Sequence, residues 1–141
     1  MPAFFVQHAG IANGPLLAKG SRFAEFHKNL QPAKGDHVIT KATPSSFVGT
    51  DLNAQLDKLG IRQLVVTVLM THMCVSSTAR DAVPLGFSVI IPEDAIATRD
   101  LASWDNKVVD HNVLQQSALA GVADVFAETK TSGAVMVIPI K

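Results

Sequence analysis

The fold of this chain is decided by residues 63–82, which read QLVVTVLMTHMCVSSTARDA. Residues 63–69 form an uninterrupted apolar and β-branched run, which is typical of a central strand covered on both faces. The residues from Cys74 to about Leu85 then predict a helix, which Pro84 and Gly86 bring to an end. A buried strand that leads into a helix is the repeating unit of an α/β fold, so this segment predicts a parallel sheet.

Strand-like and helix-like segments alternate along the rest of the chain as well. Apolar runs predict further strands at residues 4–7, 37–40, 87–91 and 125–127. Helical spacing predicts helices at residues 51–59 and 110–122, and Gly60 is suited to cap the end of the first. We therefore expect a single α/β domain over residues 1–141, built as three layers doubly wound around a mainly parallel sheet.

Size and composition narrow the classes of function. The chain has 141 residues and a mass of 15.0 kDa, which is the size of one ordinary domain. Its 12 basic and 12 acidic residues give a formal charge of +0, which argues against a nucleic-acid partner or an anionic membrane surface. Apolar residues make up 48% of the sequence and charged residues only 17%, so we expect a homo-oligomer that covers apolar surface. The single cysteine and the lack of a long apolar run predict a cytoplasmic protein.

Cys74, the only cysteine, falls where the strongest predicted strand leads into a helix. Unpaired amide groups at the start of a helix stabilise anions, so a thiol at this place is a candidate nucleophile. The carboxyl ends of the strands of a parallel sheet are also where ligands bind in doubly wound folds. A buried, unreactive thiol suits the same position, so position alone leaves both interpretations open.

Four motifs, taken together, resemble the isochorismatase-like cysteine hydrolase superfamily. In chain order they are FVQH at residues 5–8, KxxPSxFxGTxL at 41–52, TxMCVxxTAxDA at 71–82 and EDAxATRD at 93–100. The resemblance implies a doubly wound sheet and hydrolysis of a C–N bond in a small non-peptide amide or carbamoyl compound. It also implies a cysteine thioester intermediate, which divides one difficult hydrolysis into two easier steps.

The resemblance assigns roles to individual residues. Cys74 takes the place of the nucleophile, and Lys41 takes the place of a lysine that assists it. The backbone amides of Cys74 and Met70 take the place of the oxyanion hole, and a non-proline cis peptide bond is expected directly before Met70. Phe47 and His8 are candidates for substrate binding. Phe47 is equally suited to fill the core, and His8 could either line the pocket rim or accept a proton near neutral pH.

The chain departs from the family pattern at its start. Members of the family open with a strand that carries an aspartate, the base of the reaction, and we expect this first strand to be lacking here. Its absence would leave an empty position in the sheet between the strand ending at His8 and the strand before Cys74. Those two strands could pair with each other, another chain could supply a strand, or the natural protein could begin earlier.

Two functions therefore remain open from the sequence. One is a cysteine amidohydrolase that acts on a small-molecule amide. The other is a catalytically impaired family member that acts as an oligomeric structural or binding protein. No cofactor is implied, and we expect no metal site because the five histidines show no ligand spacing: His8, His27, His37, His72 and His111.

Overall fold

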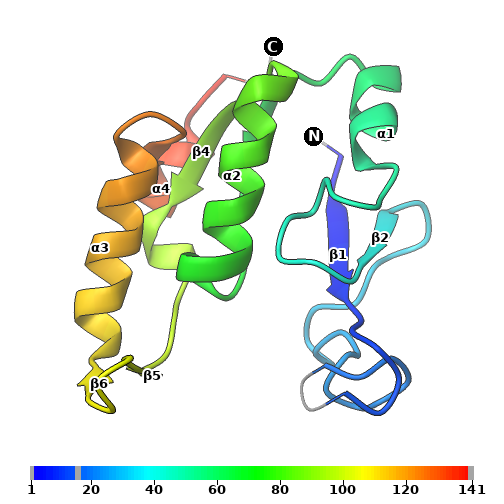
Figure 1. The fold of residues 1–141 in the computed structure, drawn as a ribbon. Coiled ribbons are helices and arrows are strands. Elements are labelled where there is room, and N and C mark those ends of the chain that lie inside the picture. The colour runs from blue at the N-terminus through cyan, green and yellow to red at the C-terminus, as the bar shows by residue number, and fades with distance from the viewer. Residues whose placement is uncertain (1, 15–16, 140–141) are drawn as a thin grey trace.

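The computed structural model describes residues 2–14 and 17–139, in which strands and helices alternate (Figure 1). The strands are β1 (Phe4–His8), β2 (His37–Lys41), β3 (Gln63–Val65), β4 (Ser88–Pro92), β5 (Leu101–Ala102), β6 (Val108–Val109) and β7 (Glu128–Lys130). The α-helices are α1 (Leu52–Lys58), α2 (Ser76–Ala82), α3 (His111–Ala123) and α4 (Ser132–Met136). A π-helical turn at Thr71–Val75 leads directly into α2.

The longer strand pairings are all parallel, which confirms the expected α/β class. β1 pairs with β2, and β4 lies between β3 and β7 in a second sheet. The short strands β5 and β6 form an antiparallel hairpin. In Figure 1, α2 and α3 lie side by side over the β4 sheet, with α2 packed on β4 and α3 on β7.

The two parallel sheets are separate among the described residues, since no pairing joins β1 or β2 to β3. The strands on either side of the expected empty position have therefore not closed up against each other. Side chains connect the two sheets instead. Ile39 of β2 and Leu56 of α1 belong to the same hydrophobic core cluster as Ile91 of β4 and Val75, the last residue of the π-helical turn before α2.

The central strand is shorter than its sequence predicts. The apolar run extends to Leu69, but β3 ends at Val65 and the last ladder contact is the Val66 amide on the Ile90 carbonyl at 2.9 Å. Beyond it the chain leaves β4, and Leu69 forms an isolated bridge with Ala97. Among the described strands β3 has a partner on one edge only, so it is an edge strand and not the predicted central one, and Leu69 beyond it is 64% exposed.

Element boundaries near the helices also differ from the expectation. The predicted strand at residues 125–127 is wrong, because the amides of Phe126 and Ala127 both donate to the Val122 carbonyl and close the end of α3. The strand follows as β7 instead. The helical segment expected from Cys74 begins three residues earlier, as the π-helical turn, and ends at Leu85 as predicted.

Glycine caps the end of two helical segments as the sequence predicts. Gly60 follows α1 with φ 68°, and Gly86 follows the 3₁₀ turn Val83–Leu85 with φ 88°, both in the left-handed region that glycine tolerates best. None of the helices in the described part of the chain combines the length and the apolar character needed to cross a membrane.

The packing of α1 gives a stability prediction. Leu56 is 2% exposed and belongs to the core cluster, whereas Leu59, just after the helix, is 46% exposed. Leu56→Ala should lower the free energy of unfolding by about 2–5 kcal/mol, because a cavity remains where the side chain was. Leu59→Ala should lower it by about 1 kcal/mol or less. Urea denaturation of both variants measures the difference, and equal losses would show that α1 does not dock on the core.

Candidate functional site

Lys41 occupies the carboxyl end of β2 and points into the protein. Side chains alternate along a strand, so Lys41 lies on the same face as the core residue Ile39, and it is only 4% exposed. Its Nζ donates to the carbonyl of Thr43 at 2.9 Å and to that of Pro44 at 2.7 Å. These two backbone acceptors replace the water that a buried ammonium group loses.

Cys74 contacts this lysine from the π-helical turn that follows β3 and leads into α2. The Cys74 Sγ lies 3.2 Å from Lys41 Nζ, and the thiol sits in the π-helical turn at a buried position. The residues expected to be nucleophile and assisting lysine are thus in direct contact, although 33 positions separate them in the sequence. The carboxyl ends of the two sheets meet at this pair.

The backbone before Cys74 has the geometry that the resemblance predicts. The peptide bond between Leu69 and Met70 is cis. The amides of Met73 and Val75 both donate to the Met70 carbonyl. Within residues 2–14 and 17–139, the Met70 amide donates to no other backbone group, so it is available to an oxyanion.

His8 completes the cluster from the end of β1. Its Nδ1 lies 3.4 Å from Lys41 Nζ, and the ring is half-buried. Burial, followed by the charge of Lys41, lowers the pKa of His8 below the ordinary 6.5, against a smaller raising effect of the Ala42 backbone. His8 is therefore neutral at physiological pH, with Nδ1 placed to accept a proton.

Phe47 lies against the core. Its ring stacks on Phe87 with the centroids 5.6 Å apart, and it packs on the hydrophobic cluster while remaining half-buried. The structure thus gives Phe47 a packing role, and a role as a wall of the substrate pocket stays a prediction.

Polar side chains hold the loop after β2 in place, a feature that the sequence analysis did not identify. The Ser46 amide donates to Thr78 Oγ1 at 3.1 Å, and that hydroxyl donates to Ser46 Oγ. These residues are buried and tie the loop to α2. The signal was present, because the motifs around Lys41 and Cys74 contain small hydroxyl residues where a core segment would have apolar ones.

The segment at residues 96–99 braces the turn that carries Cys74. The Thr71 amide donates to the Ala97 carbonyl at 2.9 Å, and His72 Nδ1 is hydrogen-bonded to Thr98 Oγ1. Burial and the nearby Arg99 lower the pKa of His72 below 6.5. The EDAxATRD motif therefore supports the nucleophile turn from outside, a role that sequence reasoning missed.

An exposed cluster of Asp100, Asp110 and His111 lies apart from this site, at the start of α3. Asp100 Oδ1 accepts from the His111 amide at 2.8 Å and from its ring at 2.9 Å, while Asp110 accepts from the Asn112 amide. The hydrogen bond that the His111 ring donates to Asp100, and then the charge of Asp110, raise the pKa of His111 above 6.5. These contacts cap the helix.

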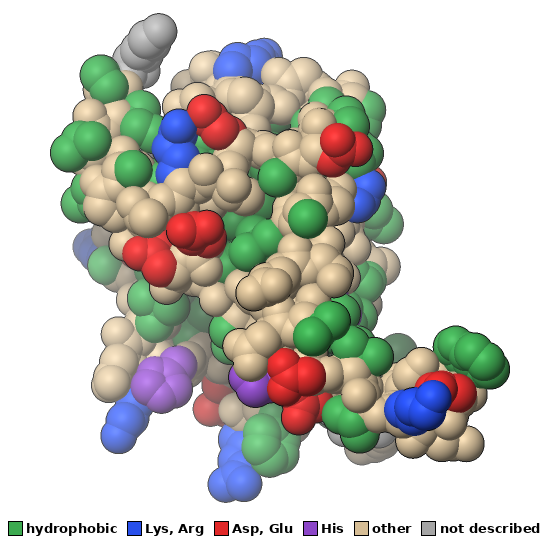
Figure 2. All heavy atoms as spheres, turned by 90° about the vertical axis from the view of Figure 1, so that its left-hand side faces the viewer, with side chains coloured by type: hydrophobic (Ala, Val, Ile, Leu, Met, Phe, Trp, Pro, Cys, Tyr) green, Lys and Arg blue, Asp and Glu red, His purple; other side chains and the backbone are tan. Residues whose placement is uncertain are grey.

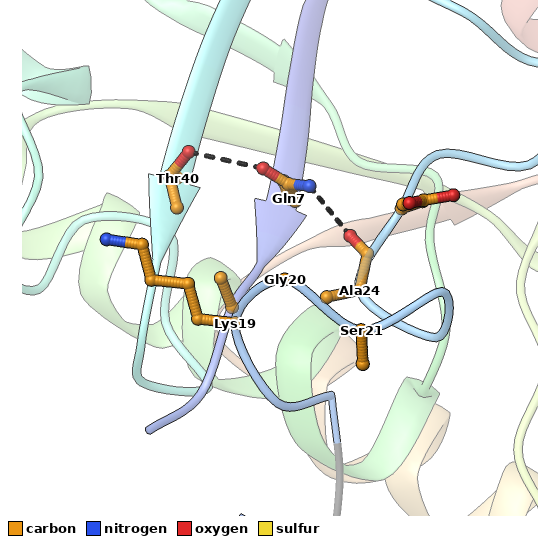
Figure 3. Close-up of a pocket in the computed structure, with 8 residues that line it drawn as sticks. Gln7, Lys19, Gly20, Ser21, Ala24 and Thr40 are labelled. Atoms are coloured by element: carbon orange, nitrogen blue, oxygen red, sulfur yellow. Dashed lines mark hydrogen bonds between the residues drawn. The ribbon is translucent and has the colours of Figure 1, made fainter. Parts of the chain in front are cut away.

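A cavity of about 320 Å³ lies on the other face of the β1–β2 sheet. Figure 3 shows Gln7 and Thr40 directed toward each other from the two strands at this cavity, and Lys19 and Ser21 of the intervening loop also line it. Gln7 accepts from Thr40 Oγ1 and donates to the Ala24 carbonyl at 2.7 Å. Because neighbouring strand residues point to opposite faces, this cavity is separate from the Lys41 and Cys74 pair.

Comparison with known proteins agrees with this geometry. The isochorismatase domain family matches residues 1–128. The chain belongs to the isochorismatase family. The secreted isochorismatase effector Isc1 of Verticillium dahliae is 39% identical to it over 131 residues, which cover 93% of this chain and 66% of that protein.

Solved structures of isochorismatase-family proteins share the doubly wound fold. The crystal structure of an isochorismatase from Pseudomonas putida KT2440 is similar with a TM-score of 0.84 and 34% identity, covering 94% of this chain and 68% of that one. The crystal structure of N-carbamoylsarcosine amidase from Thermoplasma acidophilum is similar with a TM-score of 0.77 and 28% identity, covering 94% and 73%. The chain thus spans about two thirds of the length of the Verticillium and Pseudomonas relatives.

The environments of three histidines predict how they titrate. His8 and His72 should titrate below 6.5 and His111 above it. At His8 and His72 the unfolded chain binds protons more readily, so stability falls as the pH drops through 6.5. His111 acts in the opposite sense, since its contribution is complete below 6.5 and is lost as the pH rises through its raised pKa. NMR titration of the imidazole protons, assigned with single His→Gln variants, measures the order, and a His111 that titrates after His8 and His72 on acidification would contradict it.

Proposed function

We propose that this chain hydrolyses a C–N bond in a small non-peptide amide or carbamoyl compound through a thioester on Cys74. The observation that carries the proposal is the buried contact of Lys41 Nζ with Cys74 Sγ at 3.2 Å. The likeness to a structure named as an N-carbamoylsarcosine amidase supports the class of substrate. The proposed partner is thus a small-molecule amide, with no cofactor.

In this proposal, Lys41 supplies the positive charge that activates the thiol. A cation close to a thiol favours the thiolate, which is the nucleophilic form. The ammonium group is held rigidly, because the carbonyls of Thr43 and Pro44 bind it from the side of its own loop. It therefore needs no rearrangement to act on Cys74.

The backbone amides before and at the nucleophile stabilise the next species. Attack of sulfur on the substrate carbon moves electrons to the carbonyl oxygen, which becomes an oxyanion. The Met70 amide makes no backbone hydrogen bond within the described residues, so it can donate to that oxygen, and the Cys74 amide is the second proposed donor. Such preorganised donors are often the largest contribution to catalysis of acyl transfer.

The alternative function is a catalytically impaired member that serves as an oligomeric binding or structural protein. One observation favours it, since no carboxylate in the described part of the chain forms an ion pair with Lys41. A site with a nucleophile and a lysine but without a base would acylate and then turn over slowly. Turnover measurements separate the two functions directly.

Substitution at the two contacting residues tests the hydrolase proposal. On a panel of small primary amides and N-carbamoyl compounds, Cys74→Ser should lose activity by roughly 10³-fold or more. Lys41→Met should lose roughly 10²- to 10⁴-fold, while Lys34→Met, at an exposed loop position, should retain full activity. A wild-type chain that hydrolyses nothing in the panel would favour the alternative.

Thiol reactivity provides a second readout in the same variants. Cys74 is the only cysteine, so alkylation by iodoacetamide reports on it alone. Lys41→Met should slow the reaction at neutral pH, because the stabilising cation is removed. An unchanged alkylation rate would remove Lys41 from the mechanism. Because the thiol must stay reduced to act, we place this activity in a reducing compartment such as the cytoplasm.

Exposed apolar side chains support the proposal that the chain forms a homo-oligomer. Trp104 is 94% exposed between β5 and β6, and Val113 of α3 and Met136 of α4 are exposed as well. Figure 2 shows hydrophobic side chains spread over the face that carries α3. The separated edges of β1 and β3 also invite pairing with another chain.

Light scattering at micromolar concentration should therefore find a dimer or a larger assembly. Association removes apolar area and free strand edges from water, and it should persist at high salt because it does not depend on charge. The variant Trp104→Ser, measured in the same way, tests whether this one exposed apolar side chain contributes to the association. A monomer of 15.0 kDa under all conditions would contradict the oligomer.

A further inference from the structure

The hydrogen-bond capacity of Lys41 leaves one donor for two acceptors. An ammonium group carries three N–H donors. Two of them are used by the carbonyls of Thr43 at 2.9 Å and Pro44 at 2.7 Å. The third faces both Cys74 Sγ at 3.2 Å and His8 Nδ1 at 3.4 Å. Lys41 is therefore placed between a group that must lose a proton and a group that can accept one.

We propose that His8 acts through Lys41 as the proton store of the reaction, taking up the thiol proton of Cys74 and returning it to the leaving amine. The inference rests on the proposed function and adds to it a residue, His8, that holds a proton between two steps of the reaction. It makes the proton path of this site a line of three side chains, from Cys74 through Lys41 to His8.

The proton transfers balance at each step. Lys41 passes one N–H proton to His8 Nδ1 and takes the S–H proton of Cys74, which gives a thiolate, an ammonium and an imidazolium. The sulfur lone pair then forms the C–S bond, and the electrons of the C=O double bond move to oxygen. The oxyanion then re-forms the C=O bond and the C–N bond breaks, its electron pair going to nitrogen, which takes a proton from Lys41, and Lys41 recovers one from His8. Water then adds to the thioester, and its proton passes through Lys41 to His8. The C=O bond re-forms as the C–S bond breaks, Cys74 leaves as the thiolate, and His8 returns the proton through Lys41 to restore the thiol.

The surroundings of His8 suit this role. The charged or titratable groups that face it are Lys41 from β2 and, beyond Lys41, Cys74 from the turn before α2. Within the described residues no carboxylate forms an ion pair with His8, so nothing holds it permanently protonated. Its lowered pKa keeps the imidazole neutral at neutral pH, and the Lys41 donor opposite Nδ1 favours the tautomer whose proton is on Nε2.

The other histidines of the described chain have different contacts. His37 is hydrogen-bonded to Gln55, His72 to Thr98, and His111 to Asp100. His27 accepts from the Asn29 amide in its own loop. Of the histidines in the described part of the chain, only His8 is hydrogen-bonded to Lys41.

The test measures the variant His8→Asn on two substrates whose leaving groups differ in their need for a proton. Asn Oδ1 can take the place of Nδ1 as an acceptor for Lys41, but it cannot hold a proton at neutral pH. The first probe is para-nitrophenyl acetate, whose nitrophenolate leaves without a proton, and its burst measures acylation of Cys74. The second is the amide that the wild-type chain hydrolyses fastest in the panel above, because an amine must be protonated to leave. His27→Asn is the matched control, since His27 is exposed and outside the site.

The expected result is a selective loss. His8→Asn should keep the amplitude of the nitrophenolate burst, because water can take the thiol proton in place of His8, and it should keep the urea midpoint. It should lose roughly 10²- to 10⁴-fold in kcat/KM for the amide, because the leaving amine no longer receives the stored proton. In the wild type, kcat/KM for the amide should fall on the acid side with an inflection below 6.5, and His8→Asn should remove this inflection. Imidazole added to His8→Ala should restore part of the amide activity.

Other outcomes distinguish a failure of the proton-store inference from a failure of the proposed hydrolase function. If His8→Asn hydrolyses the amide as fast as the wild type, or keeps the acid inflection, the proton-store inference is wrong and the Cys74 hydrolase stands. If both probes lose activity equally, His8 only holds Lys41 in place, and the inference is again wrong. A wild-type chain that forms no burst and hydrolyses no amide overturns the proposed function, and the inference with it.

Discussion

The structure depends on the burial of one ammonium group. Lys41 is almost wholly removed from water, and an unpaired charge in that position would destabilise the fold strongly. The chain meets this requirement with the carbonyls of Thr43 and Pro44, which can reach Nζ only if the loop turns back sharply after β2. The buried contact between Ser46 and Thr78 then ties the same loop to α2. A single charge thus determines the path of the segment that faces the nucleophile.

The same group joins two sheets that do not pair with each other. β1 and β2 lie on one side and β3, β4 and β7 on the other, and the described strands share no ladder hydrogen bond across the division. The apolar cluster around Ile39 and Val75 holds the two sheets together, but hydrophobic contacts are not directional. The contact of Lys41 with Cys74 is directional, and it fixes which ends of the two sheets meet. The site is therefore also a structural junction.

Much of the site could be predicted from the sequence because its residues lie in short motifs with fixed spacing. Cys74 and Lys41 are in contact, and the cis bond lies directly before Met70, where the resemblance places it. The ends of strands are harder to predict from the sequence. Residues 63–69 are apolar almost throughout, and nothing in their pattern indicates where a partner strand ends. The ladder stops at Val66 because its neighbours diverge, which is a property of the tertiary structure.

Other features depend on contacts between distant segments and leave no local pattern. The amides of Phe126 and Ala127 could belong to a strand or to a helix end, and only the docking of α3 decides that they close on Val122. The approach of His8 to Lys41 depends on the parallel register of β1 and β2, in which these two residues are direct partners. Sequence reasoning can place each residue at a strand end, but register is needed to bring the two together.

Charge balance explains why these three side chains belong together. His8 is neutral and no carboxylate pairs with Lys41 among the described residues, so the buried cluster carries one positive charge when Cys74 is a thiol. The one group in direct contact with Lys41 that can supply a negative charge is the Cys74 sulfur. A low-dielectric site with a lone cation favours any step that creates an anion beside it, first the thiolate and then the oxyanion. The arrangement that is least favourable for the resting fold is therefore the one that best stabilises the charges of acyl transfer.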